Sequence, residues 1–174
     1  GMLCAKDELG LGSDHSGLLE LDSDVVAGTP FTEIWGAPET VIELEITPNR
    51  PDCLSMVGVA RELAVLSDQP VRLPEFKLPE CVDSDCAVEV CDAMAAPRYS
   101  VRTIEGVKVA PSPKWLQNRL EAVGLRPINN VVDVTNYVML ETGHPLHAFD
   151  KRAISGNQIQ VRWAEVDEKL ITLD

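Results

Sequence analysis

The chain has 174 residues, 45% of them hydrophobic, with 28 acidic and 15 basic side chains and a formal net charge of −13. This length and apolar content suit one medium or two small globular domains, and the negative charge argues against a surface that holds nucleic acid tightly by its phosphates. No apolar run approaches the roughly 20 residues that a membrane span needs, and no basic-then-apolar leader opens the sequence, so we expect a cytoplasmic protein.

The first part of the chain, residues 1–22, has four glycines and no sustained hydrophobic periodicity. This pattern predicts loop with a short helix and strand. We expect these residues to form the edge of a larger structure.

A strand, a turn and a helix are predicted between residues 41 and 66. Residues 42–46 alternate apolar and acidic side chains, which is the period of a half-buried strand, and Pro48 and Pro51 end that strand. Asp52 is predicted to cap a helix over residues 53–66. One buried face is expected along this helix, made of Leu54, Val57, Ala60, Leu63 and Ala64.

Charged side chains at the start of this helix allow two interpretations. Arg50 and Arg61 could contact RNA, but their neighbours Asp52 and Glu62 favour a local set of ion pairs. After the helix, a stiff, extended connector is predicted from its prolines, Pro70, Pro74 and Pro79. Because one strand and one helix bury little area, we expect residues 23–80 to dock on a neighbour.

Residues 85–174 mix strands and helices irregularly, which favours an α+β fold. Strands are predicted at 87–90, 98–105 and 158–163, with a last one beginning near Lys169 and a turn at Gly156.

Two helices are predicted inside this part. The first is capped by Ser112, has Pro113 at its first position, carries Trp115 as a core residue and stops at Gly124. The second has Asn130 as its cap and ends at Gly143, and Asp133 lies where a carboxylate can reach back to the helix start.

Two metal-binding alternatives remain open. Five cysteines without a C-x-x-C pair argue against a disulfide framework and suit a reducing compartment. The even spacing of three of them could suggest a metal, as could a carboxylate and two histidines at intervals of three; the two sets are Cys81, Cys86 and Cys91, and Glu141, His144 and His147. Zinc sites usually have tighter ligand pairs, and Gly143 and Pro145 break the helix that would align the second set.

Two stretches carry a family resemblance. They are Ile-Thr-Pro-Asn-Arg-Pro-Asp-Cys-Leu-Ser-Met-Val-Gly at the start of 46–66, and Asn-Asn-Val-Val-Asp-Val-Thr-Asn-Tyr with Gly-His-Pro-Leu-His-Ala-Phe-Asp inside 126–150. Through them the chain resembles the beta chains of bacterial phenylalanyl-tRNA synthetases over nearly its whole length.

The resemblance implies a division into three domains. Residues 1–22 would be the tail of an oligonucleotide-binding barrel, residues 23–80 a small strand-helix packing module with a proline-rich exit, and residues 85–174 the first half of a sheet-based editing domain. In this family the editing domain hydrolyses tyrosine that has been attached by mistake to the tRNA for phenylalanine.

The same resemblance implies the site residues. Arg126 and His147, with Asn136 as a third member, would be catalytic editing residues, and Pro145 would shape the pocket wall. Ester hydrolysis needs a positioned water and stabilisation of an oxyanion; a histidine can orient or deprotonate that water, and a guanidinium can clamp a phosphate or ribose. Without the resemblance, His147 would more simply be a packing residue. The family usually has glutamine at His144, so His144 receives no role.

Cofactors and partners follow from the family as well. No cofactor is expected in this segment; ATP and magnesium would serve amino-acid activation in the whole synthetase, by an alpha subunit in an alpha2-beta2 assembly. The acidic segment would bind the tRNA weakly or not at all by itself, and no membrane is involved. Further pocket residues of the family lie beyond the position of Asp174, so we expect the segment alone to be inactive. The alternative is a non-catalytic module that docks the alpha subunit and positions tRNA.

Overall fold

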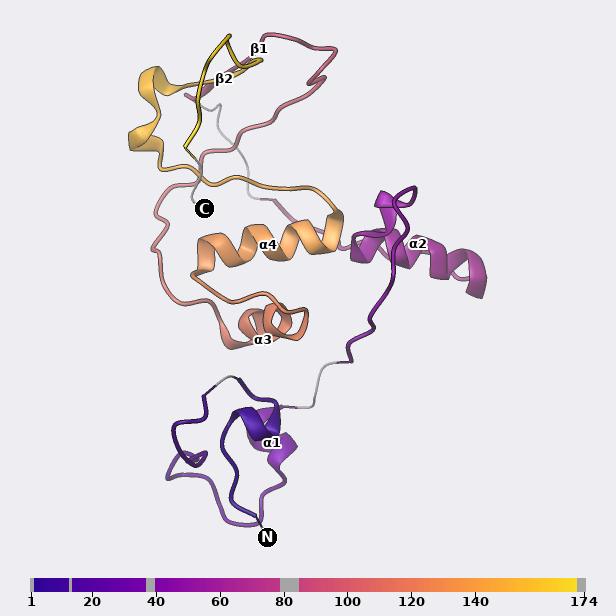
Figure 1. Ribbon diagram of the computed structural model, residues 1–174, viewed down its shortest axis with the longest axis vertical. Helices are drawn as coiled ribbons and strands as arrows, with labels where there is room; N and C mark the ends of the chain where they lie inside the picture. The colour runs from indigo at the N-terminus through magenta and orange to yellow at the C-terminus, as the bar shows by residue number, and fades with distance from the viewer. Residues whose placement is uncertain (1, 13, 37–39, 79–84, 172–174) are drawn as a thin grey trace. The chain divides into compact units, whose positions relative to one another are not determined.

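The computed structural model describes residues 2–12, 14–36, 40–78 and 85–171 (Figure 1). The chain forms two compact units, Gly1–Thr40 and Val41–Asp174, which are described separately. The three-part division predicted from the sequence stays a prediction.

The first unit consists mostly of loop. A 3-10 turn covers Asp7–Leu9, and the short helix α1 covers Phe31–Trp35. Within α1 the rings of Phe31 and Trp35 stack with their centroids 5.7 Å apart. The predicted loop character of the first 22 residues agrees with this description.

The described residues of the second unit form three α-helices, two strands and several short 3-10 turns. The helices are α2 (Met56–Ser67), α3 (Lys114–Ala122) and α4 (Asn130–Thr142), and the strands are β1 (Ala87–Val90) and β2 (Gln158–Val161). The two strands are parallel, in a register that runs from Ala87 opposite Gln158 to Val90 opposite Val161. Helices together with a small parallel sheet confirm the predicted α+β class.

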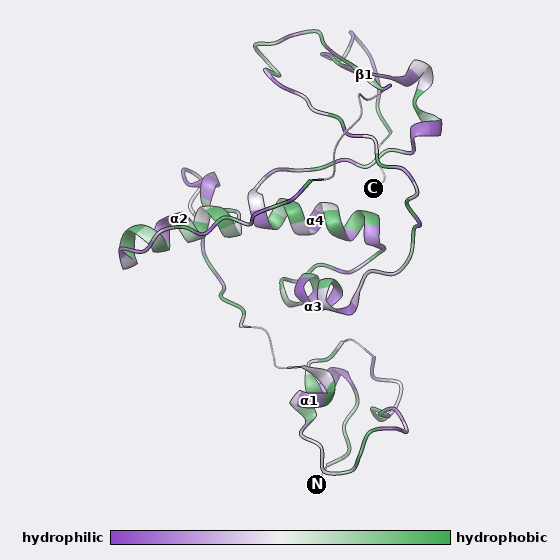
Figure 2. Ribbon diagram, turned by 180° about the vertical axis from the view of Figure 1, so that it is seen from behind, coloured by the Kyte–Doolittle hydropathy of each residue, from purple (hydrophilic) through white to green (hydrophobic). Residues whose placement is uncertain are grey.

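The best-packed core lies between α3 and α4, which are side by side in both views (Figures 1 and 2). Leu116 and Leu120, one turn apart on α3, are each 1% exposed. Beside them Trp115 meets Tyr137 of α4 edge to face, with ring centroids 5.7 Å apart. The burial of Leu116 and Leu120 follows from the helical spacing of apolar residues on α3. Trp115 itself is 55% exposed, at the edge of this contact, so its prediction as a core residue is wrong.

Three predicted strands are wrong in the described residues. Residues 41–47 and 98–105 have no regular secondary structure, and neither do residues 169–171. In the first of these segments the apolar side chains of the alternating pattern are exposed, Ile42 by 72% and Leu44 by 49%. A strand needs a neighbour to pair with its backbone, and the described residues supply none to these segments.

The helix boundaries were predicted within a few residues, but the caps were not. A 3-10 turn at Pro51–Cys53 displaces the start of α2, so Ser55 rather than Asp52 is its N-cap. At α3 the N-cap is Pro113, without a side-chain hydrogen bond, and at α4 it is Asn129 rather than Asn130. The predicted turns at Gly143 and Gly156 are confirmed by their left-handed backbones, with φ of 81° and 65°.

The predicted buried face of α2 is found only in part: Val57, Ala60 and Ala64 are half-buried, and α2 contacts α4. Leu54 and Leu63, however, are exposed by 66% and 56%. Figure 2 shows hydrophobic residues along α2. Pro79 of the predicted connector lies outside the described residues. Within them, no helix is both long and apolar enough to cross a membrane.

Candidate functional site

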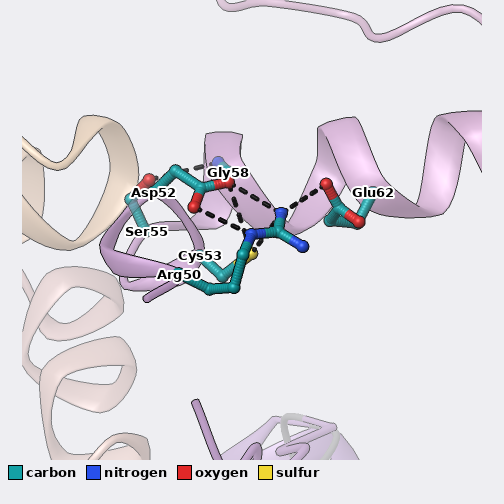
Figure 3. Close-up of polar contacts among 6 residues, drawn as sticks. All are labelled: Arg50, Asp52, Cys53, Ser55, Gly58 and Glu62. Carbon is teal, nitrogen blue, oxygen red and sulfur yellow. Dashed lines mark hydrogen bonds and ion pairs between the residues drawn. The ribbon is translucent and has the colours of Figure 1, made fainter. Parts of the chain in front are cut away.

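A compact charged group joins the turn before α2 to the helix itself. It is here called the Arg50 cluster and consists of Arg50, Asp52 and Cys53 from the turn and Glu62 from α2 (Figure 3). Arg50 donates to both oxygens of Asp52, from Nε at 3.1 Å and from Nη2 at 2.8 Å, and to Glu62 Oε1 at 2.5 Å. The predicted local ion pairs are therefore confirmed for Arg50. Arg61 forms no ion pair with the part of the chain that the structure describes.

The electrostatics of the Arg50 cluster follow from these contacts. Hydrogen bonds from Arg50 lower the pKa of Asp52 to about 2, and hydrogen bonds to Asp52 and Glu62 raise the pKa of Arg50. Loss of solvation raises the pKa of the Cys53 thiol. The side chains of Arg50, Asp52 and Glu62 are 40%, 54% and 49% exposed, so solvent screens these pairs and their effect on stability is small.

Asp52, Cys53 and Glu62 each present a potential metal-ligand atom, and these atoms lie within 4.8 Å of one another. Arg50 already uses both carboxylates, and its positive charge opposes a cation. The group is therefore better described as an ion-pair cluster than as a metal centre.

The start of α2 is fixed by a close backbone approach. Ser55 Oγ accepts a hydrogen bond from the Gly58 amide at 3.1 Å. A Cβ atom at Gly58 would collide with the carbonyl oxygen of Asp52. Glycine is therefore needed at this position because the turn of the Arg50 cluster folds directly onto the first turn of the helix.

A second polar group, here called the Asp133 cluster, consists of Ser112, Ile128 and Asp133. Ser112 Oγ donates to Asp133 Oδ2 at 2.5 Å, and the Ile128 amide donates to Asp133 Oδ1 at 2.8 Å. Asp133 is 0% exposed. The predicted role of Asp133 at the helix start is confirmed in part, since the carboxylate reaches back to the backbone; Ser112 binds this carboxylate instead of capping α3.

Two asparagines complete the start of α4. Asn129 Oδ1 accepts from the amides of Val131 and Val132 at 3.0 and 3.1 Å. Asn130 holds the preceding segment instead, because it donates to the Lys108 carbonyl at 2.9 Å and accepts from the Ala110 amide at 3.1 Å. The sequence predicted a cap at this pair but not which asparagine would serve.

The predicted site residues lie on and around α4. Arg126 is exposed in the connection between α3 and α4, and Asn136 is half-buried on α4. Pro145 and His147 are exposed in the segment that follows α4, where the His147 ring lies 6.2 Å from that of Phe149. Among the described residues, no side-chain hydrogen bond or ion pair joins any two of these four, so a shared pocket stays a prediction.

The two metal-binding alternatives from the sequence gain no support. Cys81 lies outside the described residues, while Cys86 is buried and Cys91 exposed. In the described ranges, Glu141, His144 and His147 do not form a group with metal-ligand spacing. The His144 amide instead binds Thr142 Oγ1 at 3.2 Å.

One polar contact near the small sheet had no signal in the sequence. Trp163 Nε1 donates to Asp92 Oδ2 at 2.8 Å, and this hydrogen bond lowers the pKa of Asp92. Both residues line a shallow hollow of about 200 Å³ next to the ends of β1 and β2. Their meeting depends on the parallel strand pairing, which brings residues 71 positions apart together. None of the four predicted site residues lines this hollow.

Comparison with known proteins gives consistent matches. Residues 95–174 match the family described as the B3/4 domain. Over its whole length the chain is 50% identical to the phenylalanine–tRNA ligase beta subunit of Anaeromyxobacter dehalogenans, 46% identical to that of Syntrophus aciditrophicus and 48% identical to that of Synechocystis sp.. The chain spans 22% of the length of each of these relatives.

Proposed function

This chain belongs to the phenylalanine–tRNA ligase beta-subunit family, and we propose that it supplies part of a hydrolytic editing site within such a subunit. In this proposal Arg126, Asn136 and His147 contact the tyrosine-charged end of the tRNA for phenylalanine, and Pro145 forms part of the pocket wall. The four residues all lie within the segment that matches the B3/4 domain.

The observation that carries the proposal is the way in which Arg126 is presented. Its backbone lies between two anchored neighbours: the Leu125 amide binds the Leu120 carbonyl at 2.9 Å, and the Ile128 amide binds Asp133 at 2.8 Å. Its side chain is exposed and forms no hydrogen bond or ion pair with the described residues. An arginine on a fixed backbone with five unused donors is suited to an anionic ligand such as a phosphate.

The proposed chemistry is hydrolysis of an aminoacyl ester. His147 orients or deprotonates the attacking water, and Arg126 holds the terminal phosphate or ribose so that the ester faces His147. Asn136 adds a hydrogen-bonding group from α4. Discrimination in favour of tyrosine would come from buried polar groups that pair with its hydroxyl and are left unpaired by phenylalanine.

The remaining parts of the reaction belong to the rest of the synthetase in this proposal. Amino-acid activation, with ATP and magnesium, takes place on an alpha subunit that associates with the beta subunit. With a net charge of −13, this segment makes only limited contact with the tRNA, and other parts of the assembly supply the electrostatic attraction.

The test is release of labelled tyrosine from tyrosine-charged tRNA. In the complete synthetase, His147→Ala should slow release about 100-fold or more, the usual contribution of a general acid or base, while attachment of phenylalanine continues at its normal rate. An unchanged rate of tyrosine release would remove His147 from the site. The 174-residue chain alone should give no turnover, because Arg126 and His147 are exposed and not joined within the described residues.

A second candidate function is docking of the alpha subunit and positioning of tRNA without catalysis. The observation in its favour is the exposure of apolar side chains on α2: Met56 by 69%, and Val65 and Leu66 by 82% each. Replacing Val65 and Leu66 by serine separates the two functions. Docking predicts weaker alpha–beta association from this change, whereas editing predicts unchanged tyrosine release from it and slower release from changes at Arg126 or His147.

A further inference from the structure

Asp133 lies in the first turn of α4, where its carboxylate serves residues outside its own helix. One oxygen accepts from Ser112 before α3 at 2.5 Å, and the other accepts from the Ile128 amide in the α3–α4 connection at 2.8 Å. The side chain is 0% exposed, so it cannot touch a substrate. Any effect of Asp133 on a reaction must therefore be indirect, through the two segments that its carboxylate binds.

The segment held at Ile128 is the one that carries Arg126. Gly124, with φ of 81°, turns the chain at the end of α3, and the Leu125 amide then binds the Leu120 carbonyl. Pro127 restricts the backbone on the other side of Arg126. The hydrogen bond from the Ile128 amide to Asp133 attaches this short segment to α4. The backbone of Arg126 therefore has little freedom.

Packing alone does not call for an aspartate here. A carboxylate placed among buried residues has a large desolvation cost, and an apolar side chain of similar size would avoid that cost. The α3–α4 contact already has Leu116 and Leu120, each 1% exposed. The carboxylate fixes the orientation of two donors, Ser112 Oγ and the Ile128 amide. The bond to the Ile128 amide also fixes the position of the segment that carries Arg126.

We propose that Asp133 is a positioning residue for the hydrolytic site, acting through the Ile128 amide to place the guanidinium of Arg126. This inference rests on the proposed editing function. It assigns to Asp133 no contact with tRNA or with the ester and no proton transfer.

The experiment is a double-mutant cycle on the complete synthetase, read as single-turnover release of tyrosine from tyrosine-charged tRNA. Arg126→Ala should lower the rate about 10- to 100-fold, the value expected for a lost hydrogen bond to a charged group. Asp133→Ala should lower it by a similar factor. The double variant should be no slower than Arg126→Ala alone, since both changes remove the same contact.

Asp133→Asn is the matched control. Its Oδ1 can still accept from the Ile128 amide and its Nδ2 can donate to Ser112 Oγ, so tyrosine release should stay within about threefold of the unchanged enzyme. A role of negative charge alone would give the same loss in the alanine and asparagine variants, so rescue by asparagine excludes it. Side-chain bulk alone is excluded by the Ile128 ester described next, which changes no side chain.

A second variant covers the case in which Asp133→Ala does not fold. Replacing the Ile128 amide by the corresponding ester removes one N–H and leaves every side chain in place. Tyrosine release should fall at least about threefold, the lower end for one lost hydrogen bond, and the loss should disappear in an Arg126→Ala background.

The outcomes separate the two proposals. If the effects of Arg126→Ala and Asp133→Ala multiply, or if the ester has no effect, Asp133 does not act through Arg126, while the editing function stands. If Arg126→Ala releases tyrosine at the normal rate, the role of Arg126 in the proposed function is wrong, and the positioning role of Asp133 falls with it.

Discussion

Arg50 lies in the turn before α2 and Arg126 in the connection after α3, and their surroundings differ in kind. Arg50 donates to Asp52 and Glu62, and its charge is fully engaged in an ion-pair cluster at the start of α2. Arg126 has an anchored backbone and no side-chain partner among the described residues. The arginine with more contacts is the one less suited to bind an anionic ligand, because its Nε and Nη2 already donate to two carboxylates that neutralise its charge.

The two aspartates beside them differ in the same way. Asp52 is 54% exposed and pairs with a residue two positions away, whereas Asp133 is 0% exposed and joins residues that lie 21 and five positions away. Local, exposed contacts shape one turn, while buried contacts between distant segments fix the fold around α3 and α4. The density of polar residues in a sequence motif is therefore a poor guide to which of their side chains remain free to bind a ligand.

The largest expected effect on stability is at Asp133. Asp133→Ala leaves the buried Ser112 Oγ and the part-buried Ile128 amide without their partner, which should lower the free energy of unfolding by about 2–4 kcal/mol. Asp133→Asn should lose less than half of that. Urea denaturation followed by circular dichroism measures both; equal losses for the two variants would mean that charge, not hydrogen bonding, matters here.

The next largest effect on stability is expected at Gly58, in the region of the Arg50 cluster. Glycine to alanine inside a helix normally stabilises, but here the new Cβ would collide with the Asp52 carbonyl, so Gly58→Ala should destabilise by about 1–3 kcal/mol. Gly17→Ala is the control because no atom lies near its Cβ position. A stabilised Gly58→Ala in the same denaturation assay would contradict the close approach of the turn to α2.

Loss of the Asn129 cap should have a smaller effect on stability. It accepts two amide hydrogen bonds at the start of α4, so Asn129→Ala should cost about 1 kcal/mol, while Asn129→Asp should be nearly neutral. Thermal unfolding compares the three proteins. An alanine variant as stable as the parent would show that Asn130 can take over the cap.

The smallest effect is the pH response of the Arg50 cluster. The pKa of Asp52 is about 2 in the folded protein, below the ordinary value of about 3.9, so its contribution is present above pH about 4 and is lost as the pH falls toward 2. An NMR titration of the Asp52 carboxyl carbon should show this pKa rising in Arg50→Ala. A pKa that is the same with and without Arg50 would refute the ion pair.

The sequence predicted most helices and the two paired strands, because their patterns are local. Gly143 and Gly156 mark their turns, and β1 at 87–90 was predicted with its boundaries. The pattern at 42–46 failed because alternation alone does not provide a partner strand. The sequence also did not show whether Asn129 or Asn130 would cap α4, since both are good capping residues. The choice depends on the contacts of Asn130 with Lys108 and Ala110.

For the candidate site the limits are similar. The family resemblance supplied Arg126, Asn136, Pro145 and His147, but no residue pattern indicated that the backbone of Arg126 would be held by Asp133. The bond from Ile128 to Asp133 is visible only once α3 and α4 are placed against each other. Sequence spacing alone would have left Asp133 as an ordinary residue at a helix start.

The most direct test of this account exchanges each of the two arginines for alanine in the complete synthetase and measures the rate of tyrosine release from tyrosine-charged tRNA. Arg126→Ala should reduce the rate about 10- to 100-fold, whereas Arg50→Ala, which only frees two exposed carboxylates, should leave it within about twofold. Equal rates for the two variants, or a larger loss at Arg50, would contradict the assignment of the chemistry to the α3–α4 region.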